Sequence, residues 1–139
     1  MQCFKAYDIR GRLGEELNAD VTRTIARAFA EELGACRVVL GHDPRASSEE
    51  LAAAAAEGLR AAGAEVLFLG LCGTEEMYFA TDHLGADAGI EVTASHNPMD
   101  YNGMKMVRRG SAPLDAASGL AAIKALAESG DFAADQPGG

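Results

Sequence analysis

The segment RVVLGHDPRASSEELAAAAAEGLRAAGAEVLFLG, residues 37–70, predicts a strand, a helix and a second strand in succession. Its first part is a short run rich in β-branched residues, which is typical of a buried strand. Ser47 and Glu50 then have the spacing of a helix capping box, and Gly63 follows the Ala-rich stretch as the expected end of the helix. The apolar run 64–70 predicts another buried strand. The segment is therefore expected to form a β–α–β unit whose two strands are parallel.

The alternation of strands and helices continues on both sides of this unit. Upstream, FKAYDIRG (residues 4–11) predicts a short strand, and apolar residues spaced by four from Val21 to Leu33 predict a helix. Downstream, the expected elements are a helix in 74–85, a strand in 88–94, a strand in 103–110 after the turn pair Asn102-Gly103, and a helix in 117–130. This order predicts an α/β fold, a three-layer α/β/α domain with a mixed, mostly parallel sheet.

The length of 139 residues suits one domain, which we expect to occupy residues 1–130. The tail DFAADQPGG, residues 131–139, has no hydrophobic periodicity and ends in Pro-Gly-Gly. Such a composition is typical of a linker. We therefore expect residues 131–139 to lead towards a further domain that this sequence does not contain.

Composition narrows the possible partners and the compartment. The net charge of −9 and the pI of about 4.7 argue against nucleic acid or an anionic membrane as the main partner. No apolar run approaches the ~20 residues that a membrane helix needs. Three well-separated cysteines, Cys3, Cys36 and Cys72, form no CxxC pair, so reduced thiols are expected rather than a disulfide framework or a zinc site. These features predict a cytoplasmic protein.

Three loops are expected to meet at one edge of the sheet. In parallel sheets the loops that leave the carboxyl ends of the strands form the ligand crevice, and here those loops are residues 43–45, 70–74 and 95–97. Seven of the twelve basic residues also lie in or beside Gly- or Pro-marked loops. They are either solvated surface charges or a set that gathers around a small anionic ligand.

The loop in IEVTASHNPMDYNGMK, residues 90–105, favours phosphoryl transfer over hydrolysis. Apolar and polar residues alternate up to Ala94, and Pro98 ends the strand pattern. There is no G-x-S-x-G elbow, and His96 adjoins Ser95 directly, so a Ser–His hydrolase pair is not indicated. A phosphoryl group in transfer is stabilised mainly by positive charge, which Lys105 and Arg10 could provide. The alternative is a structural turn in which Ser95 bonds locally.

Three motifs together resemble the α-D-phosphohexomutase family. The first is Thr93-Ala94-Ser95-His96-Asn97-Pro98 followed by Asn102-Gly103-x-Lys105, the second is FKAYDIRG, and the third is G-x-D-x-R-x-S at Gly41–Ser47. The resemblance spans essentially the whole chain but matches only the first of the family's four domains. Within the family, the loop and the segment GTEEMYFAT look most like bacterial phosphomannomutases of the GDP-mannose pathway. Phosphoglucomutase and phosphoglucosamine mutase domains are the alternatives inside the family.

The resemblance implies a reaction and a set of residues. Ser95 would be phosphorylated and would exchange its phosphoryl group with a hexose phosphate through a hexose 1,6-bisphosphate. The implied catalytic residues are Ser95, Lys105, His96 and Arg10, and the implied substrate-binding residues are Tyr7, Arg10, Asn97 and Lys105. Mg²⁺ would bind Ser95 through its phosphate, and the other metal ligands would come from outside this chain. Asp43 and Arg45 are expected to brace the loops.

Because domains II–IV are not in the sequence, the chain alone is expected to be inactive. The partners implied are a phosphorylated hexose and the other domains of the same polypeptide, with no nucleic acid and no membrane. From a different functional class, a non-enzymatic module that binds a phosphosugar remains an alternative.

Overall fold

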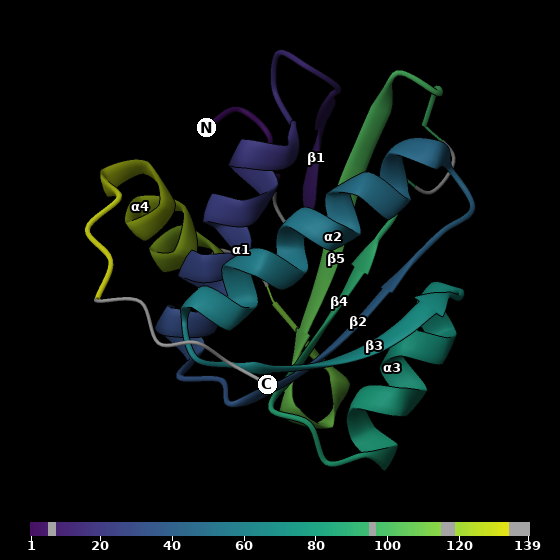
Figure 1. Ribbon diagram of the computed structural model, residues 1–139, viewed down its shortest axis with the longest axis vertical. Helices are drawn as coiled ribbons and strands as arrows, with labels where there is room; N and C mark the ends of the chain where they lie inside the picture. Colours follow the sequence, from purple (N-terminus) through teal and green to yellow (C-terminus); the bar gives the residue numbers. More distant parts are fainter. Residues whose placement is uncertain (6–7, 95–96, 115–118, 134–139) are drawn as a thin grey trace.

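A computed structural model describes residues 1–5, 8–94, 97–114 and 119–133 (Figure 1). The strands are β1 (Ile9–Arg12), β2 (Arg37–His42), β3 (Glu65–Leu71), β4 (Ala88–Val92), β5 (Tyr101–Arg108) and β6 (Ala112–Pro113). The helices are α1 (Ala19–Leu33), α2 (Ala46–Ala61), α3 (Thr74–His83) and α4 (Ala121–Ser129), with a short 3-10 turn η1 (Arg109–Ser111). The expected alternation of strands and helices is therefore present.

The sheet has the order β1-β5-β4-β2-β3, and β6 pairs with the end of β5. β2 runs parallel to both β3 and β4, whereas β5 is antiparallel to β4, β1 and β6. Among the described strands, β5 alone therefore runs against the others. This confirms the predicted mixed, mostly parallel sheet, and it brings the start of β5 to the same edge as the carboxyl ends of β2, β3 and β4.

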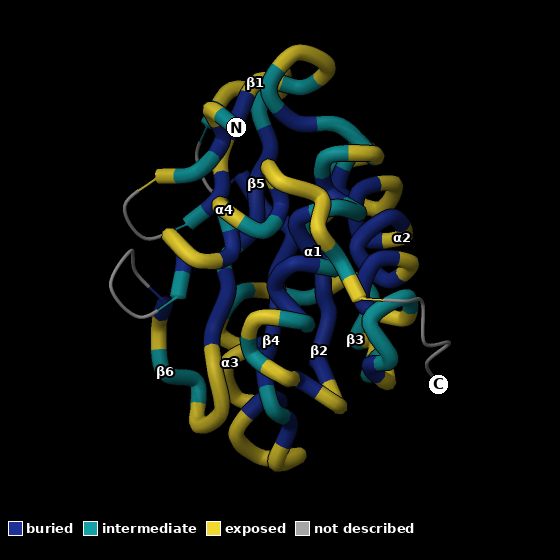
Figure 2. Tube along the Cα trace, turned by 90° about the vertical axis from the view of Figure 1, so that its left-hand side faces the viewer, coloured by how far each residue is buried: buried dark blue, intermediate teal, exposed yellow. Residues whose placement is uncertain are grey.

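Two apolar clusters define the three layers. The larger cluster joins one face of the sheet to α1, α2 and α4, and its largest buried members include Ile25, Phe29, Leu59, Ile90, Met104 and Ile123. On the opposite face, Met77 and Ala80 of α3 pack against Val39 and Val107. Figures 1 and 2 show the sheet as the central layer, with its buried strands enclosed by more exposed helices and loops. The predicted α/β/α arrangement is confirmed.

α1 and α2 approach each other closely at Gly58. A Cβ atom at this position would lie 2.1 Å from the backbone oxygen of Arg23 in α1. Such a separation is far below a van der Waals contact, so only glycine allows this helix crossing. The glycine lowers the helix propensity of α2 but permits the close packing of the two helices over the sheet.

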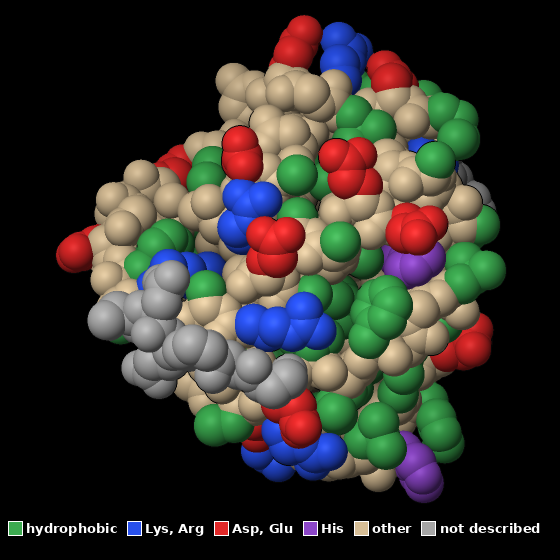
Figure 3. All heavy atoms as spheres, viewed as in Figure 1, with side chains coloured by type: hydrophobic (Ala, Val, Ile, Leu, Met, Phe, Trp, Pro, Cys, Tyr) green, Lys and Arg blue, Asp and Glu red, His purple; other side chains and the backbone are tan. Residues whose placement is uncertain are grey.

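β3 differs from the expected buried strand. Among the described strands it pairs with β2 alone and forms an edge of the sheet. Phe68 and Leu71 are 57% and 65% exposed, and Phe79 of the neighbouring α3 is also exposed. Hydrophobic side chains gather on the side of the molecule where β3 and α3 lie (Figure 3). The prediction of burial was wrong because an apolar run looks the same in a central strand and in an edge strand.

The pair Asn102-Gly103 lies inside β5 and does not form the predicted turn. Gly103 pairs with Arg10 of β1, and a Cβ at Gly103 would lie 2.0 Å from the backbone oxygen of Ile9. Glycine is thus required here by the close approach of two strands rather than by turn geometry.

The end of the described chain lies against α1. The guanidinium of Arg27 is 4.7 Å from the ring centroid of Phe132, and the backbone N–H of Ala133 donates to the Glu31 carboxylate. The domain boundary after residue 130 stays a prediction. Within the described ranges, no helix combines the length and apolar character needed to cross a membrane.

Candidate active site

The three predicted loops meet at the carboxyl ends of the parallel strands. A pocket of about 430 Å³ lies there, and its described lining residues are Asp43, Pro44, Leu71, Cys72, Gly73, Thr74, Glu76, Glu91 and Thr93. They come from the loop after β2, the end of β3 and the loop after it, the first turn of α3, and the end of β4. The loops 43–45 and 70–74 therefore converge beside the end of β4, as predicted. Of the loop 95–97 only Asn97 is described, and its carbonyl contacts Arg45.

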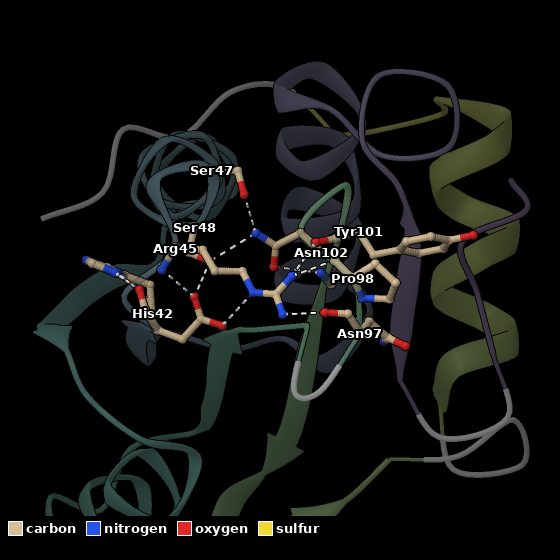
Figure 4. Close-up of polar contacts among 10 residues, drawn as sticks. His42, Arg45, Ser47, Ser48, Asn97, Pro98, Tyr101 and Asn102 are labelled. Atoms are coloured by element: carbon tan, nitrogen blue, oxygen red, sulfur yellow. Dashed lines mark hydrogen bonds and ion pairs between the residues drawn. The ribbon is translucent and has the colours of Figure 1, made fainter.

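Arg45 connects the start of α2 to the loop between β4 and β5 (Figure 4). Its guanidinium donates hydrogen bonds to the carbonyl oxygens of Asn97 (2.5 Å), Pro98 (2.8 Å) and Tyr101 (3.0 Å). The carboxylate of Asp43 accepts the backbone N–H of Arg45 at 3.1 Å and lies 4.0 Å from its Nε. These contacts show the bracing that was expected of Asp43 and Arg45.

Asn102 forms a second connection between α2 and β5. This buried side chain donates to the hydroxyl oxygens of Ser47 and Ser48, both at 2.9 Å, and its oxygen accepts the N–H of Gly103. The capping box predicted for Ser47 is wrong, because α2 already begins at Ala46 with Arg45 as the N-cap. The two serines instead anchor the first residues of β5 (Figure 4).

Lys105 and Arg10 lie on the same face of the sheet. Arg10 pairs with Gly103, and side chains alternate along a strand, so Arg10, Gly103 and Lys105 share one face. Val107, two residues further on, packs in the α3 cluster, which identifies this face as the one that α3 partly covers. Arg10 lies 3.4 Å from the Asp8 carboxylate. Within the described part of the chain, Lys105 has no hydrogen-bond or ion-pair partner.

Three of the predicted site residues, Tyr7, Ser95 and His96, lie outside the described residues. The residues that flank Ser95 and His96 are described: the N–H of Asn97 donates to the carbonyl of Ala94 at 3.0 Å. Asn97, a predicted substrate-binding residue, is half-buried, and its carbonyl is held by Arg45. The roles of the predicted catalytic and substrate-binding residues therefore stay predictions.

Sequence reasoning missed Glu91, which is fully buried in β4. Its Oε1 accepts a hydrogen bond from the Cys72 thiol at 3.2 Å, and its Oε2 is buried without a partner. Burial raises the pKa of Glu91 to about 7, and the nearby carboxylates of Asp43 and Glu76 act in the same direction. A Cβ on Gly41 would lie 2.7 Å from Glu91 Oε1 and 2.3 Å from Cys72 Sγ, so Gly41 leaves space for this pair. The available signal was an acidic residue within an otherwise apolar strand.

The described residues do not supply a complete metal site. They contain no cluster of three or more His, Cys, Asp or Glu side chains arranged to hold a metal ion. That Mg²⁺ binds through the phosphate of Ser95 stays a prediction.

The three-layer α/β/α fold is that of a phosphohexomutase first domain. The chain belongs to the phosphoglucomutase/phosphomannomutase family, whose α/β/α domain I matches residues 1–134. It is 61% identical over 132 residues to a phosphomannomutase of Salmonella typhimurium, an alignment that covers 95% of this chain and 29% of that protein.

Two further relatives agree with this assignment. A phosphomannomutase of Klebsiella pneumoniae is 58% identical over 132 residues, covering 95% of this chain and 84% of that sequence. A solved structure of a phosphoglucomutase/phosphomannomutase family protein from Burkholderia thailandensis has a TM-score of 0.88 and 42% identity, covering 98% of this chain and 31% of that one. The predicted family and domain are confirmed, and the chain spans about 29% of the length of the Salmonella relative.

Proposed function

We propose that this chain is the phosphoserine domain of a phosphomannomutase that interconverts mannose 6-phosphate and mannose 1-phosphate. The observation that carries the proposal is the bracing of the loop by Arg45, which holds three carbonyls just after Ser95 and His96. A residue that exchanges a phosphoryl group must be held in position, because this chemistry depends on positioning and charge rather than on a strong base.

In the proposed reaction, the phosphate on Ser95 is transferred to a free hydroxyl of the hexose phosphate. The bond between Ser95 Oγ and phosphorus breaks, and a bond forms between phosphorus and the sugar oxygen. The sugar hydroxyl loses its proton, Ser95 Oγ gains one, and Lys105 and His96 are the candidates for these transfers. The hexose 1,6-bisphosphate then returns its other phosphoryl group to Ser95 by the reverse chemistry, which leaves the isomeric monophosphate.

Arg10 and Lys105 are proposed to stabilise the negative charge that spreads over the phosphoryl oxygens during transfer. Their position on one face of the sheet supports this pairing of roles. Tyr7 and Asn97 are proposed to contact the phosphorylated sugar. In the same proposal, Mg²⁺ held through the phosphate of Ser95 would supply further positive charge, and its remaining ligands would come from the rest of a longer polypeptide.

The proposed protein is cytoplasmic and supplies mannose 1-phosphate for GDP-mannose synthesis. Relatives named phosphomannomutase at 58–61% identity favour mannose phosphates as substrates over glucose or glucosamine phosphates. A phosphosugar-binding module without activity is the second candidate for the isolated chain, because the chain spans only 29% of the Salmonella relative.

Steady-state kinetics of a full-length protein containing this chain tests the proposal. With mannose 1-phosphate, Mg²⁺ and a hexose 1,6-bisphosphate, Ser95→Ala is expected to abolish turnover, and Lys105→Met to lower kcat by about 10²-fold or more. Lys124→Met on α4 is the matched control and should keep wild-type kinetics. Full turnover by Ser95→Ala would refute the proposal, and a higher kcat/KM for glucose 1-phosphate would refute the assigned sugar.

A further inference from the structure

The pocket at the ends of β2, β3 and β4 contains a charged group that the proposed reaction does not use. Glu91 lies in its wall with none of its surface exposed, and Oε2 has no hydrogen-bond partner among the described residues. Burying an acceptor without a partner is costly, and burying an unpaired carboxylate is more so. A ligand that donates a hydrogen bond to Glu91 would remove this cost.

The other polar side chains of the pocket also favour a donor with positive charge. Asp43 and Glu76 add two carboxylates, whereas the described lining contains no Lys or Arg. One oxygen of Glu76 accepts the N–H of Gly73, and the Cys72 thiol already donates to Glu91 Oε1. Behind the lining, Arg45 lies 4.0 Å from the Asp43 carboxylate. Among the described residues, three carboxyl groups therefore line the same pocket. Two basic side chains stand near them: Arg45 on the Asp43 side, and Lys105 of β5, which the register pairs with Glu91 on the same face of the sheet.

We propose that this pocket binds an organic cation, an ammonium or guanidinium group, with Glu91 as its principal hydrogen-bond acceptor. The cation's N–H groups would donate to Glu91 Oε2 and would lie close to the carboxylates of Asp43 and Glu76. Leu71 and Pro44 provide apolar surface for the carbon atoms that carry the charged group.

The ionisation of Glu91 is coupled to binding of the cation. Burial keeps the pKa of this carboxyl near 7. Of the groups that face it, Cys72, Asp43 and Glu76 supply no positive charge, whereas Lys105, its cross-strand neighbour on β5, supplies one without forming an ion pair with it among the described contacts. A cation beside Oε2 favours the ionised carboxylate. Below about pH 7, where Glu91 is mostly protonated, binding of the cation must therefore release the proton of Glu91. Two sources supply the same chemistry: a small amine or guanidine in solution, or a Lys or Arg side chain from the rest of a longer polypeptide. The site does not rest on the proposed mutase activity.

The test follows the side-chain carboxyl of Glu91 by ¹³C NMR in the chain of 139 residues and in a full-length protein that contains it. Glu91→Gln assigns the signal, and the titration is recorded in sodium chloride, methylammonium chloride and methylguanidinium chloride at equal ionic strength. In the 139-residue chain, one of the two organic cations is expected to lower the titration midpoint by about half a pH unit or more relative to sodium. Glu91→Gln should remove the amide shifts that the cation causes around Cys72–Glu76, and the exposed control Glu49→Gln should keep them.

The full-length protein distinguishes the two sources. If a small molecule is the ligand, Glu91 responds to methylammonium or methylguanidinium as it does in the 139-residue chain. If a basic side chain of the polypeptide occupies the pocket, Glu91 is already ionised at pH 6 and added cations have no effect. Identical midpoints in all three salts in the shorter chain, or cation-induced shifts that survive Glu91→Gln, would overturn the proposal.

Discussion

Replacing Arg45 by methionine removes the brace of the loop while keeping an unbranched side chain of similar length. The guanidinium donates three hydrogen bonds to the carbonyls of Asn97, Pro98 and Tyr101. A hydrogen bond to a charged group contributes about 1.5–3 kcal/mol, so three would total roughly 5 kcal/mol or more if each were lost in full. Pro98 is exposed, and water can replace the guanidinium at its carbonyl. We therefore expect a loss of about 3 kcal/mol in the free energy of unfolding.

The assay combines urea unfolding of the 139-residue chain with mutase kinetics of a full-length protein. Arg60→Met, at the exposed end of the same helix, is the matched control and should change stability by less than about 0.5 kcal/mol. Arg45→Met is expected to lower kcat by about 10²-fold, because misplacement by about 1 Å is enough for such a loss. Arg45→Lys should recover part of the stability, since one ammonium reaches fewer carbonyls. Equal stability of Arg45→Met and Arg60→Met would refute the bracing role.

Two other predictions concern burial and packing. The pKa of Glu91 is raised from its usual 4.5 to about 7 in the folded chain, so the protonated side chain favours folding. Its contribution is fully present below pH 4.5 and is lost as the pH rises through 7. Glu91→Gln should remove this pH dependence of the free energy of unfolding, which amounts to at most about 3 kcal/mol. Urea unfolding at several pH values measures it, and a variant whose stability changes with pH as the wild type's does would contradict the prediction. Gly58→Ala should destabilise the fold by about 1–3 kcal/mol despite the better helix propensity of alanine, because the added Cβ would lie 2.1 Å from the backbone oxygen of Arg23. A variant that unfolds thermally at or above the wild-type temperature would contradict the close contact between α1 and α2.

The fold could be predicted because residues 37–70 carry periodic signals that do not depend on distant contacts. An apolar run, a helix with a glycine at its end and a second apolar run are local features, and they determine a β–α–β unit. The position of β3 at the sheet edge could not be predicted in this way. β3 is an edge strand because no other strand of the described sheet pairs with its outer side. The local sequence Glu65–Leu71 carries no signal for the number of neighbouring strands.

The site shows the same division between local and distant information. The loop motif identified Ser95 and Lys105 as candidates, and the register of β1 against β5 then placed Arg10 and Lys105 on one face. The turn signal of Asn102-Gly103 was overridden by tertiary contacts, because Asn102 bonds to two serines of α2. The unusual state of Glu91 arises from burial on the face of the sheet, which its apolar sequence neighbours could not reveal.

The central claim is that Ser95 carries the phosphoryl group that is exchanged with the sugar. A full-length protein containing this chain is incubated with a hexose 1,6-bisphosphate, digested and analysed by fragment mass spectrometry. We expect one phosphoryl group on Ser95, which disappears when excess hexose monophosphate is added and the bisphosphate is removed. A phosphoryl group found only on Ser47, Ser48 or Thr93, or one on Ser95 that the sugar cannot remove, would contradict this claim.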